Sequence, residues 1–152
     1  MSAFSTSLVF PDINVWLALN ATRHAHASVA EKWLLRLPPE TTLAFCRLTQ
    51  LGLLRLLTTQ VVTQVVMQAD VLTQRQAWKI YDGWFRNGWA TLLQEPAMME
   101  REFRGLTQRA TASPKDWADS YLAAFSSAAG VRLVTLDKGL SERAAGAILL
   151  QA

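Results

Sequence analysis

Four aspartates have the side chains and the positions to hold a hard divalent cation: Asp12, Asp116, Asp119 and Asp137. Asp12 follows an apolar run at residues 7–10 and precedes a segment that predicts a helix. Asp137 closes a second apolar run, at residues 131–136, in the same way. Open α/β folds build their sites just outside the carboxyl ends of their strands. Acids gathered at such an edge from distant parts of one chain indicate an oxygen-ligand site for Mg²⁺ or Mn²⁺.

Asp116 and Asp119 lie three residues apart in a predicted helix, so their side chains share one face of it. Like charges at this spacing repel each other unless a positive charge, such as a bound cation, lies near them. Asp116 has a second interpretation, because Ser113-Pro114-Lys115-Asp116 predicts a helix start capped by Ser113, with the acid at the third helical position. Asp119 has no such capping role, which favours a site role for it.

Asp12 and Asp137 have structural interpretations as well. Asp12 could cap the helix expected from Asn14, and Asp137-Lys138-Gly139 is typical of a turn. Their joint position at the ends of two strands favours a site. Further polar oxygens near the strand ends, whose alternative role is helix capping, come from Asn14, Thr49 and Thr135.

The elements that must position these side chains alternate along the chain. Strands are expected at about residues 6–10, 42–45, 89–93, 131–135 and 147–150. Helices are expected at about residues 14–21, 28–35, 48–57, 73–85, 97–107 and 113–130, whereas residues 58–69 fit a strand or a helix equally well. This alternation predicts one α/β domain over residues 1–152, built on a mostly parallel sheet.

The composition fits a folded and intracellular protein. Of the 152 residues, 51% are hydrophobic and 18% charged, which argues against disorder. The net charge of +3 is compatible with a polyanionic partner. Cys46 is the single cysteine, so no internal disulfide forms, and no apolar run reaches the roughly 20 residues of a spanning helix. We therefore expect a soluble, cytoplasmic protein.

We also expect Trp16, Trp33 and Trp117, which fall within helical apolar patterns, to pack in the core.

Four motifs in a fixed order carry a resemblance to a known family. They are Asp12-x-Asn14-Val15-x-Leu17-Ala18-Leu19, then Thr49-Gln50-x-Gly52, then Asp119-x-Tyr121-Leu122-Ala123-Ala124, and finally Thr135-x-Asp137. Together they span roughly residues 8–140 and resemble the PIN domain. More narrowly, the chain resembles the VapC-type ribonuclease toxins of bacterial and archaeal toxin–antitoxin pairs.

The resemblance implies a parallel sheet of about five strands flanked by helices, with the acids at its carboxyl edge. It also implies Mg²⁺- or Mn²⁺-dependent cleavage of RNA, inhibition by a cognate antitoxin protein, and a homodimer. Asp12, Asp119 and Asp137 occupy the acidic positions of the family. Asn14 and Thr135 match its small polar positions, and Asp116 is an additional acid.

One position departs from the family pattern, because Gln50 stands where the family usually has Glu. Gln offers a carbonyl oxygen but no charge, which should weaken the binding of a cation. Two interpretations follow: an active nuclease with a rearranged acid set, or a catalytically weakened RNA-binding or regulatory module.

Contacts to RNA and to the antitoxin are expected on either side of these motifs. Lys115 and Lys138 each stand beside a proposed acid and are expected to contact substrate phosphates. Leucines near the Thr49-Gln50 motif are candidates for antitoxin docking, with burial in the core as the alternative: Leu51, Leu54 and Leu57.

Overall fold

The computed structural model describes residues 8–60 and 71–151. Most of the segment that fitted a strand or a helix equally well, and the expected start of the first strand at residue 6, lie outside these ranges. Strands and helices follow one another along the chain as β1 (Leu8–Pro11), α1 (Ile13–Asn20), α2 (Ala27–Leu35), β2 (Thr42–Phe45), α3 (Arg47–Leu57), α4 (Gln74–Arg86), β3 (Ala90–Leu92), α5 (Met99–Leu106), α6 (Asp116–Ala129), β4 (Arg132–Thr135), α7 (Lys138–Arg143) and β5 (Ile148–Leu149).

The strands form one five-stranded sheet in the order β3-β2-β1-β4-β5. Every neighbouring pair is parallel, which confirms the predicted fold class. From β1 the chain adds β2 and β3 on one side and then returns to add β4 and β5 on the other. The strand order therefore reverses between β1 and β4, and parallel sheets bind ligands at such a switch point, outside the carboxyl ends of the strands.

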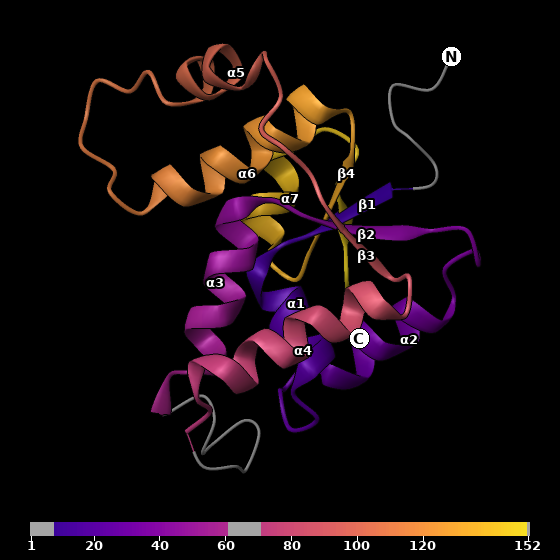
Figure 1. Ribbon diagram of the computed structural model, residues 1–152. Coiled ribbons are helices and arrows are strands. Elements are labelled where there is room, and N and C mark those ends of the chain that lie inside the picture. Colours follow the sequence, from indigo (N-terminus) through magenta and orange to yellow (C-terminus); the bar gives the residue numbers. More distant parts are fainter. Residues whose placement is uncertain (1–7, 61–70, 152) are drawn as a thin grey trace.

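Helices cover both faces of the sheet because successive strand residues point to opposite sides. In β1, Val9 belongs to the cluster packed under α1, α3 and α4, whereas Phe10 belongs to the cluster under α5, α6 and α7. Leu43 and Ala44 of β2 divide between the two clusters in the same way. Figure 1 shows α5 and α6 on one side of the sheet and α1, α2 and α4 on the other. The strand ends thus lie between two helix layers.

Several local signals in the sequence are realised. The Thr73 hydroxyl accepts a hydrogen bond from the Gln76 backbone N–H (3.1 Å), and the Gln76 side chain accepts one from the Thr73 N–H (2.9 Å), as a capping box predicts. Gly130 ends α6 with φ of 67°, the left-handed conformation that glycine adopts most readily.

Two expectations and one alternative interpretation were wrong. The helix expected to start at Ser113 begins at Asp116, with Lys115 as its cap, because residues 113–116 form a turn closed by a bond from the Asp116 N–H to the Ser113 carbonyl. Asp137-Lys138-Gly139, for which a turn was the alternative interpretation, instead begins the helix α7 at Lys138. Trp16 is buried against the ring of Phe45, but Trp117 is 57% exposed and is not a core residue. In the described ranges, no helix has both the length and the apolar character needed to cross a membrane.

Candidate active site

The carboxyl ends of β1 and β4 bring two of the predicted acids together. The Asp12 N–H donates to the carbonyl of Val134 (2.9 Å), which fixes the end of β1 beside the end of β4. The Thr135 hydroxyl donates to the Asp12 carboxylate and accepts from the Asp137 N–H (3.0 Å). Thr135 therefore links Asp12 to the backbone of Asp137 across the switch point.

Asp12 is a buried carboxyl with a structural bond of its own. It is only 5% exposed, and its Oδ1 accepts from the Val15 N–H (2.9 Å) at the start of α1. Burial raises its pKa, and the negative charge of Asp137 adds to the rise. The hydrogen bonds from Thr135 and from the Val15 and Asn14 backbone act in the opposite direction, because they favour the charged form. Asp12 therefore caps α1 and also lies at the candidate site.

Asp119 shares an electrostatic environment with the two strand-end acids. It is half-buried on α6, and burial followed by the charge of Asp137 raises its pKa, while Arg143 opposes the rise. Asp137 is exposed, and its carboxylate accepts from the Leu140 N–H (3.2 Å) as the cap of α7. Asp137 thus acts on both Asp12 and Asp119, which places three acids from three elements in one repulsive field.

Asp116 is set apart from this group by two arginines. Its carboxylate pairs with Arg109 (3.0 Å) and Arg143 (3.4 Å) and accepts a hydrogen bond from the Ser113 hydroxyl (2.5 Å). The Ser113 bond, followed by the two positive charges, lowers the pKa of Asp116. Arg143 also donates to the hydroxyl of Ser120. Asp116 therefore belongs to an ion-pair network beside the other acids.

The second motif lies buried at the start of α3. The Thr49 hydroxyl accepts from the Cys46 N–H (3.0 Å) and donates to the Cys46 carbonyl (3.1 Å), so it closes the first turn of the helix. The Gln50 carbonyl oxygen accepts from Arg47 (2.6 Å), and its side chain is also hydrogen-bonded to Tyr81. Gln50 is thus fixed in place beside a guanidinium.

The remaining predicted site residues lie at the surface. Asn14 is exposed on the first turn of α1, and its backbone N–H bonds to Asp12. Lys115 and Lys138 are exposed at the starts of α6 and α7, each next to an acid in the sequence.

The structure adds residues that the sequence analysis did not select. Arg143 reaches Asp116 because α7 forms where a turn was the alternative interpretation. Glu95 follows β3 at the carboxyl edge and accepts a hydrogen bond from the Tyr121 hydroxyl (3.2 Å). A signal for Glu95 was available, because it follows the third strand as Asp12 follows the first.

The chemistry of Asp12, Asp119 and Asp137 suits a hard divalent cation. None of the ion pairs between described residues involves these three acids, so no basic side chain in direct contact relieves their repulsion. In residues 8–60 and 71–151, no group of three or more Asp, Glu, His or Cys side chains is placed so that the group could hold a metal ion by itself. Mg²⁺ does not require such a group, because it is commonly held by one or two carboxylates with water and substrate phosphate completing its shell. The residues present therefore fit such an ion.

Comparison with known proteins identifies the family of the chain. No protein-family model matches the chain. It is 36% identical over 132 residues to Ribonuclease VapC41 of Mycobacterium tuberculosis, in the strains CDC 1551 / Oshkosh and ATCC 25618 / H37Rv, and the match covers 86% of this chain and 90% of each relative. The crystal structure of M. tuberculosis VapC20, described as a Sarcin-Ricin loop cleaving toxin, shares the fold with a TM-score of 0.60 at 16% identity, over 88% of this chain and 93% of that one. The chain therefore belongs to the VapC family of PIN-domain ribonuclease toxins.

Proposed function

We propose that this VapC ribonuclease hydrolyses RNA phosphodiester bonds in a reaction that depends on Mg²⁺ or Mn²⁺. The acids Asp12, Asp119 and Asp137 would hold the ion, one or two of them directly, with water and substrate phosphate completing its shell. The observation that carries the proposal is the convergence of acids at the β1/β4 switch point, where the Thr135 hydroxyl donates to the Asp12 carboxylate and accepts from the Asp137 N–H. The charge of Asp137 also acts on Asp119 of α6. The repulsion of Asp12 and Asp119 by Asp137 costs stability when these carboxylates are charged, and a bound cation offsets that cost. When bound, the ion supplies Lewis acidity toward the scissile phosphate and activates water.

Each neighbouring residue has a part in this proposal. Thr135 orients the Asp12 carboxylate through its hydroxyl, and the Asn14 backbone N–H holds the same carboxylate. Lys115 and Lys138 bind substrate phosphates from the exposed starts of their helices. Asp116 orders Arg109 and Arg143 beside the site rather than binding the cation, because its carboxylate is already paired with both.

The partners follow from the family and the surface. We propose that a cognate antitoxin restrains the toxin, that the chain forms a homodimer, and that it works as a single domain in the cytoplasm, where its RNA substrate is found. Leu51 is 61% exposed and Leu54 is half-buried, so these two remain candidates for antitoxin docking. Leu57 is fully buried and belongs to the core.

The test is cleavage of pooled cellular RNA by the purified, antitoxin-free protein with Mn²⁺ or with EDTA. We expect metal-dependent cutting that falls more than about 100-fold in Asp12→Asn, Asp119→Asn and Asp137→Asn, since even indirect support of a metal site is worth 10- to 100-fold. Asp82→Asn, an exposed acid on α4, is the matched control and should cut as the parent does. Cutting that persists in EDTA, or in all three site variants, would refute the metal mechanism.

A catalytically weakened RNA-binding or regulatory module is the second candidate function, and Gln50 is the observation that favours it. Its neutral oxygen already accepts a hydrogen bond from Arg47, whereas a glutamate there would bring a further negative charge to this edge of the sheet. The discriminating variant is Gln50→Glu. If the parent is folded, binds RNA and does not cut, gain of Mn²⁺-dependent cutting in this variant identifies a degenerate nuclease. Continued inactivity identifies the binding module.

A further inference from the structure

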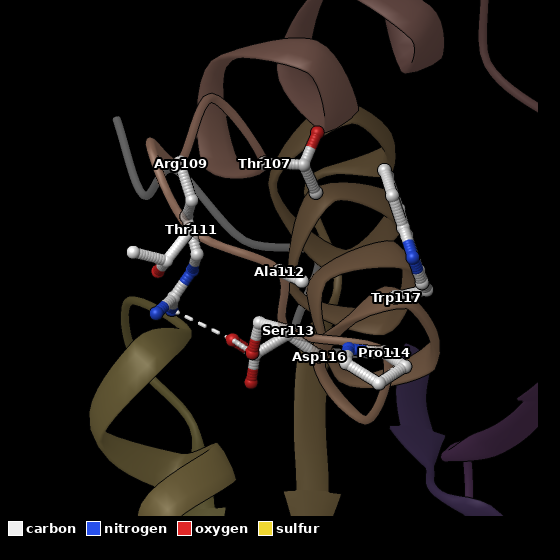
Figure 2. A pocket seen from close by; sticks show the side chains of 8 residues that line it. All are labelled: Thr107, Arg109, Thr111, Ala112, Ser113, Pro114, Asp116 and Trp117. Carbon is white, nitrogen blue, oxygen red and sulfur yellow. Dashed lines mark hydrogen bonds and ion pairs between the residues drawn. The ribbon is translucent and has the colours of Figure 1, made fainter.

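A pocket of about 350 Å³ lies beside the proposed acidic site, where the α5–α6 connection meets the start of α6. Figure 2 shows the indole of Trp117 on one side of this pocket and the side chains of Arg109 and Thr111 on the other, with Ser113 and Asp116 at its base. Of these side chains, only Arg109 and Asp116 enter the proposal above, as an ion pair beside the site.

Trp117 is the unusual member of the pocket. At 57% exposure it leaves a large apolar ring in water, in a helix that buries Leu122, Ala123 and Phe125 further along. A tilted contact with the Phe103 ring, at 5.9 Å between centroids, supports the indole without covering it. Figure 2 shows the ring nearly edge-on, with one face turned toward the pocket. An aromatic face presented in this way is suited to stacking with another flat ring.

The charge around the pocket favours an anion. Arg109 lines the pocket and pairs with Asp116, and the same carboxylate also pairs with Arg143 outside the lining, so Asp116 does not neutralise both guanidinium groups. Arg109 is about half exposed, and one ion pair uses only part of the five N–H donors of a guanidinium. Remaining donors can reach a phosphate oxygen. Hydroxyl groups of Thr107, Thr111 and Ser113 also line the pocket and can bond polar edges.

The pocket lies next to the acidic site but is separate from it. Trp117 and Asp119 are two residues apart on α6, so they are separated by about 3 Å along the helix axis and by about 200° around it. Asp116 lies between the two features, because it lines the pocket and its charge acts on Asp119. A molecule bound at the acids can therefore extend around the start of α6 into the pocket.

We propose that this pocket binds one unpaired nucleotide of the RNA substrate, flanking the scissile bond, with its base stacked on Trp117 and its phosphate held by Arg109. The inference rests on the proposed nuclease function and adds to it a base-stacking subsite beside the scissile bond. Stacking on an aromatic side chain requires a free base face, and in a duplex both faces of a base are covered by its neighbours.

The test uses Asp12→Asn as a binding-competent, non-cleaving background, with Trp117→Ala, Trp117→Phe or Trp89→Ala added to it. Trp89, which is 37% exposed and contacts Trp84 of α4 on the other helix layer, is the matched control. The probe is a short mixed-sequence RNA oligonucleotide, alone or annealed to its complement. We expect Trp117→Ala to weaken binding of the single strand by about 5- to 150-fold, Trp117→Phe to retain most of the affinity, and Trp89→Ala to bind as the background does.

Two further readouts separate binding from folding. Ala112→Leu narrows the pocket without changing Trp117, and we expect it to weaken single-strand binding as well. In the cleaving protein, Trp117→Ala should raise KM more than it lowers kcat. If the parent cuts RNA and Trp117→Ala retains the parental KM, or if duplex and single strand bind alike, the pocket assignment is wrong and the nuclease stands. If the parent neither cuts nor binds RNA, the proposed function fails, and the pocket assignment fails with it.

Discussion

Asp12 shows how one residue can serve both the fold and the chemistry. Its Oδ1 caps α1 through the Val15 N–H, and its other oxygen accepts from Thr135. An N-cap bond contributes about 1 kcal/mol. Burial of the charged carboxylate beside Asp137 acts against this gain, as the raised pKa indicates. A neutral capping residue at position 12 would therefore stabilise the fold at least as well as this carboxylate does.

This balance predicts the effect of Asp12→Asn on stability in the metal-free protein. A carboxyl whose pKa is higher folded than unfolded binds its proton more tightly when folded. The fold therefore gains stability as pH falls through the raised folded pKa, and the charged form costs stability above it. Because Asn caps a helix as well as Asp does, we expect the free energy of unfolding of the variant at neutral pH to be at least equal to that of the parent. Its activity should nevertheless be lost.

Urea denaturation in EDTA, at neutral pH and at about pH 5, measures the difference. We expect the advantage of Asp12→Asn to shrink at the lower pH, as the parent carboxyl takes up its proton. Asp82→Asn changes an exposed acid on α4, away from the site, and should stay within about 0.5 kcal/mol of the parent at both values. A loss of several kcal/mol in Asp12→Asn would mean that the charged carboxylate is needed for folding, which contradicts the argument.

At the scale of elements, the position of α1 depends on its contact with α3. A Cβ built on Gly52 would overlap the end of the Ile13 side chain and lie 2.8 Å from its Cγ1. Because Ile13 directly follows Asp12, a displacement of Ile13 at this contact would also displace Asp12, the proposed metal ligand. The second motif therefore keeps a glycine for close approach between helices.

We expect Gly52→Ala to destabilise the fold by about 1–3 kcal/mol, as overpacked contacts do, and to reduce cleavage by displacing the start of α1. In an Ile13→Ala background, which lacks the opposing side-chain atoms, Gly52→Ala should be much less destabilising. A double-mutant cycle in urea tests this, with Gly105→Ala as the control, since a Cβ there would meet no atom within 4 Å. Additive effects at positions 13 and 52 would contradict the contact.

The elements also show where sequence reasoning succeeds and where it does not. β2 begins and ends at the predicted residues, because an apolar run bounded by polar residues leaves little choice of strand. The helix α7 was missed because Asp137-Lys138-Gly139 is typical of a turn and glycine disfavours helix. It forms because Asp137 caps it and Leu140 is buried beneath it. These are tertiary contacts, and the position of Arg143 depends on them.

At the scale of the whole molecule, the topology explains why the candidate site could be predicted when its details could not. Strands read from the sequence in the correct order place Asp12 and Asp137 at the carboxyl edge of a parallel sheet, whatever the lengths of the helices. The exposed position of Trp117 and the pairing of Asp116 with Arg109 depend instead on how the α5–α6 connection folds back on α6. No local pattern encodes that path.

A cation held between the two halves of the sheet should stabilise the whole molecule, because a ligand that binds only the folded state shifts the unfolding equilibrium. At a Mn²⁺ concentration about 100 times the dissociation constant, the gain is about 2.7 kcal/mol, or roughly 5–10 °C for a chain of this size. We expect thermal melting to show this rise over EDTA in the parent and in Asp82→Asn. The rise should be much smaller in Asp119→Asn and Asp137→Asn, which change acids from α6 and from the end of β4. Because melting requires no RNA and no turnover, an equal rise in all four proteins would show that the cation binds elsewhere, even if every variant had lost cleavage.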